Sequence, residues 1–206
     1  MAIQRTNATA APNLEERRNF WLWTYASDAF KEVVSTWDAF MAIRRQLSEP
    51  VQKTLTAGLL VTYAKPFLPC HGVGKLPESV IPTALLNAHK ALLDLRHKSF
   101  AHLDASNYQS SDPNIGNVNQ VRLAQTKEHY KIEFITPSPD ILIKCKIRAL
   151  AAMLSDKATY HTDKFIEKYI HKLRLKPGEY RLSLDPIDNT PFVPAPPLPM
   201  LKATRS

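Results

Sequence analysis

The stretch LLNAHKALLDLRHKSFAHLD, Leu85–Asp104, organises the rest of the chain. At about 100° per residue, most of its leucines and Phe100 fall on one side of a helix. His89 and Arg96 fall near the middle of that apolar stripe. An unpaired charge is costly to bury, so a guanidinium in such a place is expected to have a charged partner or to meet a ligand.

Arg96 and His102 are separated by a spacing that one straight helix does not accommodate. Six residues of unbroken helix turn the two side chains about 120° apart around the axis. Two arrangements bring them to one spot. Either the helix unwinds near Phe100–His102, or a second copy of the chain completes the cluster.

Two amphipathic helices are predicted before this stretch, from Leu14 to about Leu47 and from Pro50 to about Ala64. Apolar side chains in the first helix recur at three- and four-residue spacings, as in a helix with one buried face. They are Trp23, Ala26, Phe30, Val33, Trp37 and Phe40. So long a helix needs a partner along its length, which points to a bundle.

After the stretch, Gln120–Gln125 and Tyr130–Ile135 alternate in polarity and predict a β-hairpin. A long fourth helix is expected from Asp140 to Leu173, and Pro177-Gly178 stops it. The many prolines that follow predict an extended arm without regular structure.

The predicted fold is therefore mainly α: an up-down bundle of four or more helices, a small β-hairpin and an extended Pro-rich C-terminal arm. We expect residues 1–13 to be a disordered N-terminal segment, residues 14–176 to be the helical domain, and residues 177–206 to be the arm.

Composition narrows the choice of partners. The chain has 206 residues, a formal net charge of +8 and an isoelectric point near 9.5, which favour a polyanion such as nucleic acid. Cys70 and Cys145 are too few for a disulfide framework, and no CxxC or HExxH pattern suggests a metal site. There is no Gly-rich phosphate loop, apolar 18-residue run or secretory signal, so we expect no cofactor, no membrane and a cytoplasmic location.

The segment from Arg96 to His102 consists of an arginine, a polar residue, four residues and then a histidine. It resembles the signature of the HEPN superfamily, helical domains found in toxin, abortive-infection and RNA-cleaving proteins. The surrounding LDLRHKSFAHLD is similar to the LR-x-K-x-FAH-x-D form of stand-alone bacterial members. VTYAKPF, Val61–Phe67, resembles a YxRPF segment that precedes it in some of them, with Lys65 where arginine is commoner. His89 also stands where such proteins carry histidine, and in helix order the resemblance covers about Leu14–Leu175.

This resemblance implies a metal-independent endoribonuclease with a toxin or phage-defence role, whose two motifs face one cleft in a homodimer. Imidazole can move protons near neutral pH, and guanidinium can hold a phosphate. If the roles of the family motif apply here, Arg96 and His102 would be catalytic, and His97 would orient these side chains or assist them. The residues implied in substrate binding are Lys98, Ser99, Asp104, His89, Tyr63 and Lys65. RNA would be the substrate, and a toxin role implies an antitoxin protein as a further partner.

Two other interpretations stay open. The chain fits a noncatalytic homodimeric helical module that binds RNA, nucleotide or a protein partner. Arg96 also fits a structural role, as one half of an ion pair between helices with Asp28 or Asp38, and Asp104 fits a helix-end cap.

Overall fold

The computed structural model describes residues 11–97, 108–109, 117–118, 120–125, 130–135, 139–173, 175–176, 178–188 and 191–195. The α-helices are α1 (Leu14–Ile43), α2 (Glu49–Ala64), α3 (Leu86–Arg96), α4 (Pro139–Lys144), α5 (Ile147–Phe165) and α6 (His171–Leu173). Short 3₁₀ turns are η1 (Arg44–Gln46), η2 (Lys65–Phe67), η3 (Glu78–Val80) and η4 (Thr83–Leu85), and η6 (Ile166–Ile170) is π-helical. The strands are β1 (Tyr108–Gln109), β2 (Asn117–Val118), β3 (Gln120–Gln125), β4 (Tyr130–Ile135), β5 (Tyr180–Leu182) and β6 (Phe192–Pro194).

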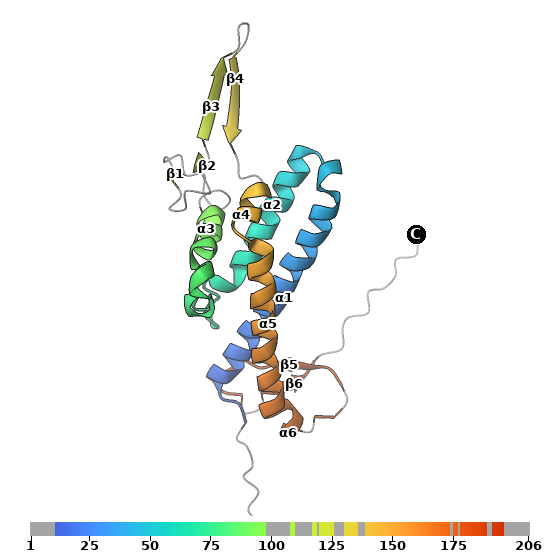
Figure 1. Cartoon of the computed structure of the whole chain (residues 1–206). Helices are drawn as coiled ribbons and strands as arrows, with labels where there is room; N and C mark the ends of the chain where they lie inside the picture. Colours follow the sequence, from blue (N-terminus) through green and yellow to red (C-terminus); the bar gives the residue numbers. More distant parts are fainter. Residues whose placement is uncertain are drawn as a thin grey trace, which may run out of the picture.

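The helices form the up-down bundle that the sequence predicts (Figure 1). α1 crosses the length of the bundle, α2 returns beside it, α3 runs back up, and α4 with α5 descends again. α1 and α5 lie antiparallel and in contact over much of their length. None of the described helices is both long and apolar enough to cross a membrane.

α1 begins where its sequence supplies a cap. The Asn13 side chain accepts a hydrogen bond from the Glu16 backbone N–H at 2.9 Å, and the Glu16 carboxylate accepts one from the Asn13 N–H at 3.0 Å. This capping box satisfies amide groups that otherwise have no partner at a helix start. The predicted stripe of α1 faces the core: Ala26, Phe30, Val33, Trp37 and Phe40 are buried.

The core is one continuous cluster to which every long helix contributes. Its fully enclosed large side chains include Tyr63, Phe30, Phe40, Leu59, Leu60, Leu76, Leu92, Leu95, Leu142, Ile147, Leu150 and Leu154. Leu76 comes from the loop between α2 and α3, and Phe67 from η2 is also buried, so that loop closes one side of the bundle.

The single fourth helix expected from the sequence is divided. Lys146 adopts a left-handed conformation with φ of 52°, and this residue separates α4 from α5. The Cys145 and Lys146 amides donate back to Ile141 and Ile143, and the Lys146 carbonyl accepts from Leu150. A lysine in this conformation costs about 1 kcal/mol. Leu142, before the break, and Leu150, after it, are both fully buried in the core.

The predicted hairpin is confirmed with its strand ends. β3 and β4 pair antiparallel, with Gln120 opposite Ile135 and Gln125 opposite Tyr130. In Figure 1 the hairpin projects beyond the end of the bundle where α3 ends and α4 begins.

The C-terminal arm is extended as predicted, but the expectation that it lacks regular structure was wrong for its first part. β5 and β6 pair antiparallel, with Tyr180 opposite Pro194. Proline is tolerated there because it sits at the end of an edge strand. The buried Arg17 of α1 donates through Nη1 to the Ser183 carbonyl at 2.9 Å, which ties this small sheet to the bundle.

Candidate functional site

α3 carries the first part of the predicted motif, and Arg96 is its last α-helical residue. The buried face of α3 consists of His89, Ala91, Leu92 and Leu95. Arg96 lies on nearly the same side of α3 as His89, at the end of the helix, and is half-buried, whereas His97 is exposed. The sequence placed Arg96 near the middle of the apolar stripe, so its side chain is closer to solvent than predicted.

Arg96 is the last residue of α3, and the backbone of His97 after it stays helical, with φ of −66° and ψ of −48°. Within the described residues no hydrogen bond or ion pair engages the Arg96 guanidinium. It is therefore available to an anion that approaches this end of α3.

The structural ion pair considered for Arg96 is not formed with Asp38. The Asp38 carboxylate receives two hydrogen bonds from the Arg148 guanidinium, at 2.7 Å from Nε and 3.0 Å from Nη2. Arg148 therefore holds the pKa of Asp38 below its usual range. Asp28 is exposed on α1, and no ion pair joins it to Arg96 in the described part of the chain.

Four predicted site residues, Lys98, Ser99, His102 and Asp104, lie outside the described residues. The predicted unwinding near Phe100–His102 lies there too. The relative placement of Arg96 and His102, and the composite site that it implies, therefore stay predictions.

Tyr63 and His89 are brought together by the fold, but inside it. The Tyr63 hydroxyl lies 2.8 Å from Nδ1 of His89, and both side chains are fully buried. Phe67 packs its ring edge-to-face on His89 with a centroid distance of 4.4 Å, and Phe30 packs on Tyr63 and on Phe67. In this closed arrangement neither Tyr63 nor His89 reaches a ligand in solution. The pair instead joins α2 to α3 and fixes the helix that ends in Arg96.

Burial also sets the protonation of this pair. Loss of hydration lowers the pKa of His89 to about 4, because the imidazolium would be stranded away from water. The same desolvation raises the pKa of Tyr63, so its hydroxyl stays protonated. The other ring nitrogen of His89, Nε2, is buried and has no hydrogen-bond partner among the described residues.

Lys65 is exposed on η2, directly after α2. Arg96 follows His89 by seven residues, a rise of about 10 Å along a helix. α2 and α3 run in opposite directions, so Lys65 lies near the start of α3 and Arg96 at its end (Figure 1). The fold therefore separates Lys65 from the predicted motif.

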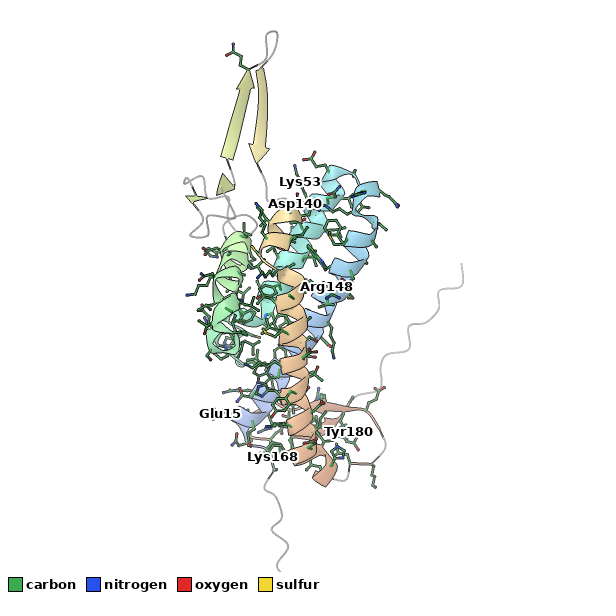
Figure 2. The ribbon with its side chains drawn as sticks, viewed as in Figure 1. Glu15, Lys53, Asp140, Arg148, Lys168 and Tyr180 are labelled. Carbon is green, nitrogen blue, oxygen red and sulfur yellow. The ribbon has the colours of Figure 1, made fainter. Side chains whose placement is uncertain are left out.

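A second region with the geometry of a site was not predicted from the sequence. An open cavity of about 430 Å³ lies between the first half of α1, the loop before η3 and the end of α5. Lys168 borders it, and Figure 2 shows Lys168 at the opposite end of the bundle from Asp140. The lining residues are Glu16, Asn19, Phe20, Leu22, Trp23, Lys75, Leu76, Pro77, His161, Lys164, Phe165, Lys168 and Tyr169. They come from three distant segments, and only the aromatic richness of α1 hinted at them.

Metal-binding geometry is absent from the described residues, where no group of three or more His, Cys, Asp or Glu side chains could hold an ion. No family model, no curated protein and no solved structure matches this chain.

Proposed function

We propose that this protein is a metal-independent endoribonuclease of the HEPN type that acts as a homodimer, with a role as a toxin or in phage defence. Arg96 holds the scissile phosphate, and His102 moves the protons. His97 assists from the polar position of the motif. Lys98, Ser99 and Asp104 complete the substrate contacts.

The position of Arg96 carries this proposal. It ends α3 at the border between core and solvent, and no carboxylate neutralises it within the described residues. A guanidinium that serves only structure is usually paired. A guanidinium without such a partner can donate its N–H groups to the non-bridging oxygens of a phosphate.

The proposed reaction needs only groups present in RNA and in the motif. One imidazole takes the proton of a ribose 2′-hydroxyl as that oxygen attacks the adjacent phosphorus. The bond from phosphorus to the 5′-oxygen breaks, and this oxygen takes a proton from an imidazolium. The products are a 2′,3′-cyclic phosphate and a 5′-hydroxyl. Arg96 stabilises the charge that builds on the phosphate oxygens in the transition state.

Positioning of Arg96 falls to the buried bond between Tyr63 and His89. A catalytic group held loosely loses much of its effect, because a shift of about 1 Å can cost about a hundredfold in rate. The bond fixes α3 against α2 two helical turns before Arg96. Tyr63 and His89 are thus assigned as positioning residues rather than substrate contacts.

A homodimer is supported by the six-residue spacing of Arg96 and His102 and by exposed apolar side chains. Met41, Ile43, Val51 and Ile143 are all at least one-third exposed. They belong to the end of α1, the start of α2 and α4, at the same end of the bundle as Arg96. Apolar surface of this kind is available to a second copy.

The test is RNA cleavage by the purified chain in the presence of EDTA. We expect cleavage with 2′,3′-cyclic phosphate and 5′-hydroxyl ends. Arg96→Ala and His102→Ala should each abolish it, since both act on the same step. An RNA with 2′-deoxy nucleotides at the cleaved positions should stay intact, because the attacking hydroxyl is missing.

Two matched substitutions serve as controls. Arg181→Ala removes an exposed arginine from β5 at the far end of the bundle, and His71→Ala removes an exposed histidine from the loop after α2. Both should leave cleavage unchanged. RNA that is bound but never cut, with binding lost in Arg96→Ala, would replace the nuclease by a noncatalytic RNA-binding module. Intact RNA without binding would reject both functions.

A further inference from the structure

The cavity at the far end of the bundle from Arg96 has an aromatic wall. Phe20 and Phe165 stack with ring centroids 4.1 Å apart and planes within 14°. Trp23 and His161 stack equally closely, with planes within 10°. Phe20, Trp23 and His161 are half-buried rather than sealed in the core. Flat rings in such a wall favour a ligand that is itself flat and partly apolar.

Three lysines and one carboxylate border the same cavity. The carboxylate, Glu16, is already engaged: Lys168 donates to it at 2.8 Å, and the Tyr169 hydroxyl and the Asn13 amide also donate to it. These donors lower the pKa of Glu16 to about 2, so it is ionised and largely neutralises Lys168.

Lys75 and Lys164 supply the remaining charge. Both are exposed, and no carboxylate pairs with either of them within the described residues. The Lys164 ammonium lies 4.4 Å from the centre of the Tyr160 ring, a contact that leaves its charge in place. A concave surface with two uncompensated ammonium groups attracts an anion.

The pKa of His161, in the wall of this cavity, is affected by the same positive charges. Burial, followed by the nearby ammonium groups of Lys157 and Lys164, lowers its pKa below the usual value. Its ring is therefore neutral at pH 7 and serves the wall as a flat surface. The charge of the cavity comes from its lysines.

We propose that this cavity is a nucleotide-binding site, in which the base lies against the Trp23–His161 and Phe20–Phe165 wall and Lys75 and Lys164 hold the phosphate. A volume of about 430 Å³ lies within the range of small-molecule sites. The proposal stands apart from the ribonuclease, because it uses none of the residues of the Arg96 motif. The nucleotide is either a free molecule or one residue of an RNA strand, since both present the same chemistry.

Calorimetric titration of the full chain with ADP tests the site. Adenosine, which lacks the phosphate, and pyrophosphate, which lacks the base, are titrated beside it. We expect ADP to bind and each fragment to bind at least about tenfold more weakly. The double variant Lys75→Ala/Lys164→Ala should weaken ADP by about tenfold or more. The control Lys31→Ala/Lys90→Ala removes two exposed lysines that do not line the cavity and should leave the affinity unchanged.

Tryptophan fluorescence locates the base. A base against the wall should quench Trp23, and Trp23→Phe should remove the quenching while ADP still binds, because phenylalanine keeps an aromatic surface. Arg96→Ala should change neither signal, so failure of the ribonuclease proposal leaves this one intact.

A single-stranded oligoadenylate distinguishes the two sources. If it binds, loses affinity in Lys75→Ala/Lys164→Ala and quenches Trp23, while ADP alone does not bind, the site takes a nucleotide of an RNA strand. If neither ADP nor the oligonucleotide binds, or if both bind equally well to the double variant, the proposal is wrong.

Discussion

The Tyr63 hydroxyl and Nδ1 of His89 lie 2.8 Å apart in the interior of the bundle, across the contact between α2 and α3. Both side chains are fully buried, and Nε2 of His89 has no partner in the described part of the chain. Of the two ring nitrogens of His89, Nδ1 therefore has a hydrogen-bond partner and Nε2 has none. A buried group without a partner is costly, so this pair makes the fold sensitive to acid and to substitution.

The first prediction is a loss of stability in mild acid. The pKa of His89 is about 4 in the folded chain, against a usual value of 6.5. The unfolded chain therefore takes up this proton first as the pH falls. The free energy of unfolding should therefore be unaffected by His89 above pH 6.5. It should fall as the pH decreases toward 4, by about 3 kcal/mol in total. Urea unfolding at pH 7 and pH 4.5 measures it.

Substitution of His89 separates this effect from other titrations. His89→Phe should remove most of the pH dependence in that window. His161 also has a lowered pKa, so His161→Asn is the matched control and should keep most of it. Equal pH dependence in the parent chain and in His89→Phe would contradict the assignment.

The second prediction concerns the partner of His89. Tyr63→Phe leaves Nδ1 buried without a hydrogen-bond partner and should lower the free energy of unfolding by about 1–3 kcal/mol. The double variant Tyr63→Phe/His89→Phe has no polar atom left to satisfy there. It should be more stable than the sum of the two single changes by at least about 1 kcal/mol. If the effects of the two single changes simply add, the Tyr63 and His89 side chains do not stabilise the fold through a shared hydrogen bond.

The third prediction places a second acid-sensitive group at the start of α1. The pKa of Glu16 is lowered from 4.5 to about 2, first by its hydrogen bonds from Lys168 and Tyr169. Its contribution is therefore complete above pH 4.5 and is lost as the pH falls toward 2. The Glu16 side chain is about one-third exposed, and allowing for solvent screening we expect about 1–2 kcal/mol.

Glu16→Gln tests it, because glutamine keeps the capping box while removing the charge. The variant should be less stable than the parent at pH 7 and equal to it near pH 2, as measured by thermal unfolding. Asn13→Ala removes the cap itself and should cost about 1 kcal/mol at both pH values. A Glu16→Gln variant as stable as the parent at pH 7 would mean that the ion pair contributes nothing.

The fourth prediction is a gain in stability at Gly58, inside α2. A Cβ atom added there meets no atom within 4 Å, and alanine favours the helix over glycine. Gly58→Ala should raise the free energy of unfolding by about 1 kcal/mol. Gly74→Ala is the contrasting control and should destabilise, since Gly74 has φ of 100° and closes a turn on Cys70. A loss of stability in Gly58→Ala would contradict this prediction.

Helices and the hairpin could be predicted from the sequence because their signals are local. The stripe from Ala26 to Phe40 repeats with the period of a helix, and Gln120–Gln125 alternates with the period of a strand. The break at Lys146 could not be predicted, because lysine has no special tendency toward a left-handed conformation. It forms because core packing on both sides of the break outweighs the local cost.

The candidate site was predictable only in part, because contacts between distant segments of the chain decide which side chains are buried. Periodicity on α3 put Arg96 in the middle of the apolar stripe. Arg96 does lie on nearly the same side of α3 as the fully buried His89, but it is the last residue of the helix and is only half-buried. How far the core extends along a helix depends on its neighbours, and these come from distant parts of the chain.

The cavity at the far end was harder still to predict. Its wall joins Trp23 to His161, which are 138 positions apart in the sequence. No local spacing records such a contact.

The fifth prediction tests whether Arg96 and His102 of different protomers act together. On a continuous helix the two side chains diverge by about 120°, so a cleft between two copies can pair the Arg96 of one with the His102 of the other. Arg96→Ala and His102→Ala chains are mixed, unfolded and refolded together. In each mixed dimer one cross-paired site has both side chains and the other has neither. Half of the dimers are mixed, so we expect about a quarter of the parent cleavage rate. Each variant refolded alone should stay inactive, and light scattering should show dimers throughout. An inactive mixture of dimers would mean that both side chains act from one protomer, which requires the helix to unwind between them.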